Sequence, residues 1–96
     1  MSSEERSILT RTSILDRLDG SLCDAVLERT GTGAHLESLA RRTLFLAPID
    51  RGHNWFKCHD LLREYLRRQL GSEQPESLPG LHRRASAWFR ERGEIE

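Results

Sequence analysis

The apolar residues of this chain change their spacing twice, and this change limits the folds that the chain can adopt. Up to residue 42 they recur every three or four positions, as on one face of a helix. Leu44 to Ile49 is instead an unbroken apolar run, and residues 54–58 are rich in aromatic side chains, as is typical of strands. The helical spacing returns after residue 60. A chain of 96 residues can build one small core.

The first part of the chain predicts three helices, over residues 13–18, 21–30 and 34–42. Ser13 and Ser21 each stand three residues before an acidic side chain, the spacing of a capping box at a helix start. A turn at Gly31-Thr-Gly33 separates the second helix from the third. Two helices joined by a tight turn indicate a helix-turn-helix.

The middle of the chain predicts a β-hairpin over residues 44–58, with its turn at Asp50-Arg-Gly-His53 and Pro48 on an edge strand. Helices should follow over residues 60–70, closed by Gly71, and 79–92, closed by Gly93. Apolar side chains of both should face inward: Leu61, Leu62, Tyr65, Leu66, Leu70, Leu81, Ala85, Trp88 and Phe89.

The predicted fold class is mainly α with a small β-hairpin (α+β), a winged helix-turn-helix followed by C-terminal helices. We expect a winged-helix domain over residues 1–70, a polar linker over 71–78 and a C-terminal helix within 79–96 that leads toward a superhelical repeat domain. Apolar surface left exposed on this last helix could pair two copies of the chain.

The charge balance argues against direct DNA binding. Fifteen basic and fifteen acidic residues give a net charge of zero, whereas DNA-binding domains carry a basic surplus. The third helix would place Glu37 against the phosphates, with Arg41 and Arg42 at its far end. The hairpin adds Arg51 and Lys57. A stand-alone winged-helix DNA-binding domain therefore remains the alternative function.

Other features indicate a cytoplasmic chain. No apolar run is long enough to cross a membrane, and Met1 to Glu5 lacks the character of a signal peptide. Cys23 and Cys58 lie in segments predicted to be buried, so we expect free thiols.

Five blocks of sequence resemble a known family. They are residues 11–18, 21–26, 44–50, 55–61 and 81–88, and in this order they are similar to the winged-helix segment of MalT-like, LuxR-type transcriptional regulators, which are signal-transducing ATPases. The resemblance covers residues 8–92. It implies a module between two other domains of the same polypeptide. One is an ATPase domain that binds ADP or ATP, and the other is a superhelical repeat domain that binds the inducer. Related modules accompany some bacterial serine/threonine kinases.

The resemblance also implies a role for His59. In signal-transducing ATPases a histidine at this junction resembles a sensor that contacts the β-phosphate of ADP in the resting state. An imidazole beside the amides of a helix start can donate to a phosphate oxygen. Here Cys58 stands in place of the usual apolar residue. The alternative is a histidine that caps the helix, together with Asp60.

The sequence lacks the features of an enzyme or a metal site. It contains no Gly-x-x-x-x-Gly-Lys-Ser/Thr phosphate loop, so no nucleotide hydrolysis and no cofactor are assigned to this chain itself. His53, Cys58 and His59 lack the fourth ligand of a structural zinc site. A hydrolytic arrangement of a serine with His59 and Asp60 fails because adjacent side chains point in different directions.

Overall fold

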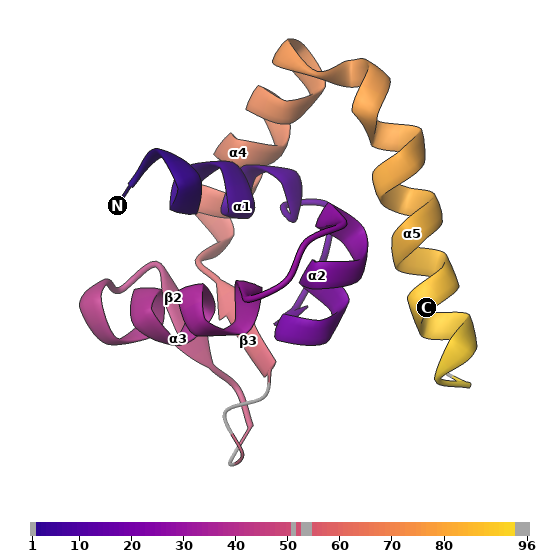
Figure 1. Ribbon diagram of the computed structural model, residues 1–96. Helices are drawn as coiled ribbons and strands as arrows, with labels where there is room; N and C mark the ends of the chain where they lie inside the picture. Colours follow the sequence, from indigo (N-terminus) through magenta and orange to yellow (C-terminus); the bar gives the residue numbers. More distant parts are fainter. Residues whose placement is uncertain (1, 51, 53–54, 94–96) are drawn as a thin grey trace.

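The computed structural model describes residues 2–50, 52 and 55–93 (Figure 1). Its elements are α1 (Ser3–Arg11), β1 (Leu18–Asp19), α2 (Gly20–Leu27), α3 (Thr32–Arg42), β2 (Leu46–Pro48), β3 (Trp55–Cys58), α4 (Asp60–Glu73), a 3-10 turn (Pro75–Ser77) and α5 (Leu78–Glu91). This order confirms a mainly helical winged helix with a small antiparallel sheet, followed by C-terminal helices. Within the described residues, no helix is long and apolar enough to span a membrane.

The helices pack on one another in pairs. α1 packs on α4, and α2 packs on both α3 and α5. In Figure 1, α4 leads away from β3, the chain bends sharply, and α5 returns beside α2. One core of buried apolar residues joins all these elements, from Ile8 in α1 to Phe89 in α5.

The sheet confirms the predicted hairpin and adds one strand. β2 pairs with β3, and Pro48 lies on the edge strand β2 as predicted. The added strand is β1, in which Leu18 pairs with Phe56. This strand contains two residues, too few for an alternating pattern to be visible in the sequence.

The predicted helix over residues 13–18 is wrong. The first helix is α1, and its capping box uses Ser2 and Glu5: the Glu5 amide donates to Ser2 Oγ at 3.1 Å, and the Ser2 amide donates to Glu5 Oε1 at 3.0 Å. Ser13 Oγ donates instead to the Thr10 carbonyl at the end of α1. Pairing of Leu18 with β3 holds the end of the predicted segment extended, so tertiary contact overrides the local spacing.

The second and third helices exist, but the capping box expected at Ser21 and Asp24 does not. Asp19 caps α2 by accepting from the Leu22 amide at 3.0 Å. Asp24 accepts from the Thr32 amide at 3.0 Å and so holds the start of α3. A Cβ on Gly20 would lie 2.8 Å from Gly33 Cα, so the starts of α2 and α3 can approach this closely only without a side chain there.

The helix α4 corrects two predictions. Gly71 does not end α4, which continues to Glu73. Leu66 and Leu70 of α4 are buried, but Leu61 is 72% exposed and Tyr65 is also exposed, so the prediction that both face inward is wrong. The helix packs through a single stripe, because α1 covers only one of its sides.

The expected face of α5 is buried as predicted, through Leu81, Ala85, Trp88 and Phe89. Trp88 stacks edge-to-face on Trp55 of β3, and its indole Nε1 donates to Ser21 Oγ at 3.1 Å. The four residues are covered within the chain itself, so the exposed apolar surface expected on this helix lies elsewhere. Pairing of two copies stays a prediction.

Candidate functional site

His59 lies at the junction where β3 passes into α4 and makes contacts through both backbone and ring. Its amide donates to the Phe45 carbonyl at 2.7 Å, which extends the pairing of the hairpin by one residue. Its ring Nδ1 accepts a hydrogen bond from the Leu61 amide at 3.3 Å, and so caps α4. The structure therefore contains the capping contact that the sequence left as the alternative to a phosphate sensor.

The capping bond also determines which ring nitrogen can donate. A neutral imidazole has one acceptor and one donor, so an accepting Nδ1 places the proton on Nε2. His59 is exposed, and within the described residues Nε2 has no hydrogen-bond partner. The two roles are compatible, because each uses a different nitrogen.

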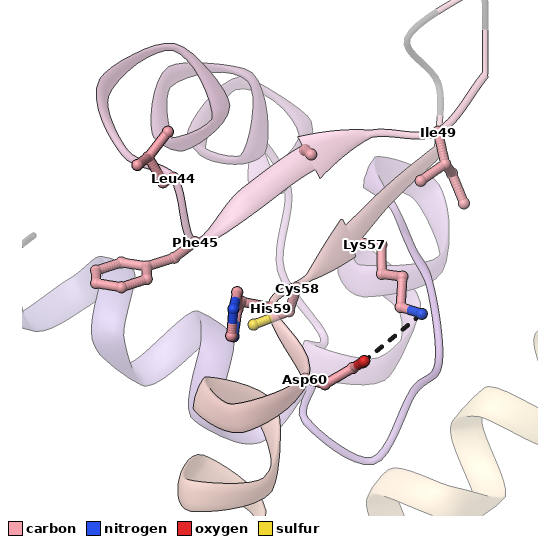
Figure 2. A pocket seen from close by; sticks show the side chains of 8 residues that line it. Leu44, Phe45, Ile49, Lys57, Cys58, His59 and Asp60 are labelled. Carbon is pink, nitrogen blue, oxygen red and sulfur yellow. Dashed lines mark ion pairs between the residues drawn. The ribbon is translucent and has the colours of Figure 1, made fainter.

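An open pocket of about 300 Å³ adjoins His59 (Figure 2). It is lined by Leu44, Phe45, Ala47, Ile49, Lys57, Cys58, His59 and Asp60. In Figure 2 the imidazole lies on the side of Phe45 and Leu44, whereas Lys57 and Asp60 extend to the other side and form an ion pair at 3.6 Å. The imidazole therefore borders apolar side chains, and the nearby charges of Lys57 and Asp60 compensate each other.

Large apolar side chains are exposed around this junction. Leu44 is 95% exposed, and the other members are partly exposed. We call this set the junction surface: Leu44, Phe45, Ile49, Leu61 and Tyr65. It contains all the large apolar side chains that are exposed in the part of the chain that the structure describes. Leu44, Phe45 and Ile49 line the pocket beside His59, and Leu61 and Tyr65 lie in the first two turns of α4. Exposed apolar side chains of this kind are typical of a protein interface.

Sequence reasoning missed the junction surface. It placed Leu44 and Phe45 in a strand and Leu61 and Tyr65 in a helix core, because all four are apolar. The available signal was α4 itself, where Leu61 and Tyr65 form a second stripe beside that of Leu62, Leu66 and Leu70. The core covers only one of the two stripes, so the other can contact a further domain or protein.

The thiol of Cys58 borders the same pocket but is poorly suited to chemistry. Burial raises its pKa, Arg63 acts in the opposite direction, and Asp60 raises it further. A thiol with a raised pKa stays protonated at neutral pH and is a weak nucleophile and metal ligand. Both cysteines are free and buried, as predicted.

Of the residues considered for zinc, the structure describes Cys58 and His59. Within the described residues, no group of three histidine, cysteine or acidic side chains could hold a metal ion. His53 is the third residue considered for zinc, and it lies outside the described residues. Arg51 of the hairpin turn also lies outside them.

Two of the basic residues considered for DNA contact are engaged within the molecule. The Arg42 guanidinium donates to Glu5 of α1 and to Ser38, and Lys57 pairs with Asp60. Glu37 and Arg41 are both exposed and line a second pocket beside β2 and β3. The face of α3 therefore carries an acidic side chain beside its basic one.

Comparison with known proteins assigns this chain to a family. The family model of the MalT winged helix domain matches residues 1–78. The chain is 38% identical over 90 residues to the serine/threonine-protein kinase PknK of Mycobacterium tuberculosis, covering 94% of this chain and 8% of the kinase. It is 34% identical over 90 residues to the HTH-type transcriptional regulators MalT of Vibrio parahaemolyticus and Vibrio cholerae, covering 93% of this chain and 10% of each regulator. The chain thus spans about a tenth or less of the length of these relatives.

Proposed function

This chain belongs to the MalT winged helix domain family, and we propose that it is a regulatory module that couples the nucleotide state of a longer, ATP-dependent transcriptional regulator to its activation. The relatives carry a domain of this kind as a small part of a much longer chain. The partners in this proposal are the other domains of the same polypeptide: an ATPase domain that holds ADP or ATP, and a superhelical repeat domain that binds the inducer.

The observation that carries the proposal is the exposed Nε2 of His59 beside the junction surface. The ring cannot turn freely, because Nδ1 is engaged with the Leu61 amide. The apolar side chains around it suit a neighbouring protein domain, which would exclude water from a contact between Nε2 and a phosphate oxygen. A hydrogen bond of this kind that exists only in the ADP-bound state would favour that state.

The chain contributes a contact in this proposal and no catalysis. It has no phosphate loop, so nucleotide would be bound and hydrolysed by the ATPase domain. We expect the isolated chain to show no ATPase activity.

The test changes His59 in a full-length polypeptide that carries this module with its ATPase domain. His59→Ala removes a hydrogen bond to a charged group, worth about 1.5–3 kcal/mol, and should weaken ADP binding roughly 10- to 150-fold. His59→Ser is the matched variant, because serine also accepts from a helix-start amide and keeps the cap. ADP affinity is measured by calorimetry and stability by thermal melting.

The two variants separate the two roles of the ring. Both should lose ADP affinity, whereas only His59→Ala should lower the melting temperature appreciably. Unchanged ADP affinity in both variants would leave His59 as a helix cap and overturn the proposed sensor role.

A further inference from the structure

A third pocket, lined by polar side chains, lies between α1 and the end of α4. It has a volume of about 220 Å³ and is lined by Ser3, Arg6, Ser7, Thr10, Arg11, Glu73 and Gln74. The pocket stands at the opposite end of α4 from His59, about 20 Å away along a helix of 14 residues. It is therefore separate from the candidate site described above.

The helix α1 presents a row of hydroxyl groups to this pocket. Ser3, Ser7 and Thr10 follow one another at intervals of four and three residues, which places their hydroxyls along one face. Thr10 Oγ1 donates to the Arg6 carbonyl at 2.7 Å, whereas the hydroxyls of Ser3 and Ser7 make no hydrogen bond within the described residues.

Two arginines of α1, Arg6 and Arg11, line the pocket. Neither Arg6 nor Arg11 forms an ion pair with any residue that the structure describes. Arg11 Nε is moreover buried without a hydrogen-bond partner in that same part of the chain. Buried donors are almost always satisfied in proteins, so an unsatisfied one beside a pocket indicates a missing acceptor. Guanidinium groups suit the oxygens of phosphate in particular.

Glu73 adds selectivity to this arrangement. Glu73 is exposed at the end of α4 and lines the same pocket as the two arginines of α1, and its carboxylate accepts hydrogen bonds only. A phosphate group that retains one proton can donate to this carboxylate, because the second pKa of a phosphate monoester lies near 6 and that of free phosphate is higher. Sulfate has no such proton and would meet Glu73 as a like charge.

We propose that the pocket between α1 and α4 binds a protonated phosphate group, either free phosphate or the phosphate of a small monoester. Arg6, Arg11 and the hydroxyls of Ser3 and Ser7 donate to its oxygens, and Glu73 accepts from its remaining O–H. This proposal does not depend on the role of His59, which concerns a nucleotide held by another domain.

The test titrates the 96-residue chain with three probes at pH about 6 and low salt: inorganic phosphate, glycerol 3-phosphate and sulfate. Chemical shifts of the backbone amides of α1 and α4 report the binding. We expect saturable binding of at least one phosphate probe in the millimolar range, with sulfate about tenfold weaker. The tighter of the two phosphate probes identifies the source.

Variants connect binding to the named residues. Arg11→Gln should weaken phosphate binding about tenfold or more, and Arg6→Gln, an exposed position, should do the same without disturbing the core. Arg90→Gln on α5 is the matched control, because it removes an equal charge far from the lining residues and should change little. Glu73→Gln should bring the affinities for phosphate and sulfate together.

Three results would overturn the proposal. They are the absence of saturation by either phosphate probe, an equal loss of binding in Arg90→Gln and Arg6→Gln, or a preference for phosphate over sulfate that survives Glu73→Gln. Melting temperatures of all variants ensure that binding is compared between folded chains.

Discussion

Cys23 illustrates how strongly burial can change the chemistry of a single residue. It lies in α2, and its side chain is fully buried in the core. Burial raises the pKa of its thiol from 9.0 to about 12, since a thiolate there would lose its hydration. In the unfolded chain the same thiol ionises near 9.0.

This difference predicts a loss of stability in alkaline solution. Below pH 9.0 the thiol is protonated in both states and has no effect; between pH 9.0 and about 12 only the unfolded state loses the proton and is favoured. The free energy of unfolding should fall by about 1.4 kcal/mol for each pH unit in this window. Urea denaturation at several pH values measures it.

Cys23→Ala is the control for this prediction. The variant will be less stable at every pH because it leaves a cavity, but its stability should decline less steeply above pH 9.0. The other groups that titrate there are common to both proteins and cancel in the comparison. Parallel curves for the two proteins would contradict the assigned pKa.

At the scale of the element, α4 has two apolar stripes with different roles. Leu66 is 2% exposed and packs in the core, whereas Leu61 is 72% exposed and belongs to the junction surface. Both are leucines of the same helix, so differences in helix propensity do not separate them. Their effects on stability should differ through burial alone.

Alanine substitution at each position tests this division. Leu66→Ala removes buried methyl groups and leaves a cavity, which should lower the free energy of unfolding by about 2–4 kcal/mol. Leu61→Ala should change it by less than about 0.5 kcal/mol, as for other surface substitutions. Urea denaturation of the 96-residue chain measures both. A comparable loss in the two variants would show that Leu61 is covered in solution.

At the scale of the whole molecule, the distribution of charge determines how the chain meets nucleic acid. Its net charge is zero, Arg42 is bound to Glu5, and α3 exposes Glu37 beside Arg41. Binding to duplex DNA depends on an excess of cations along one face, which releases counterions from the phosphates. The pairs described here reduce that excess on the face of α3 that a winged helix would present.

We therefore predict that the chain has no measurable affinity for mixed-sequence duplex DNA at about 150 mM salt. Fluorescence anisotropy of a labelled duplex, titrated at several salt concentrations, measures this directly. Micromolar binding with a steep dependence on salt would instead favour the alternative of a stand-alone DNA-binding domain.

Local spacing in the sequence was enough to determine the types of most elements and their order. The change from helical spacing to short apolar runs correctly separated the hairpin from the helices around it, and Leu81, Ala85, Trp88 and Phe89 correctly marked the buried face of α5. His59 could be placed at the start of α4 for the same reason. These properties depend on neighbours along the chain, which a sequence displays.

Only the tertiary structure decided which of several equivalent patterns is used. Three serine-acid pairs have the spacing of a capping box, and Ser2 with Glu5 forms one. Two stripes of α4 are apolar, and the position of α1 determines which is covered. The neighbours of His59 come from β2–β3 pairing, which brings the Phe45 carbonyl to its amide. Each choice depends on contacts between distant residues, and the spacing of nearby residues contains no information about them.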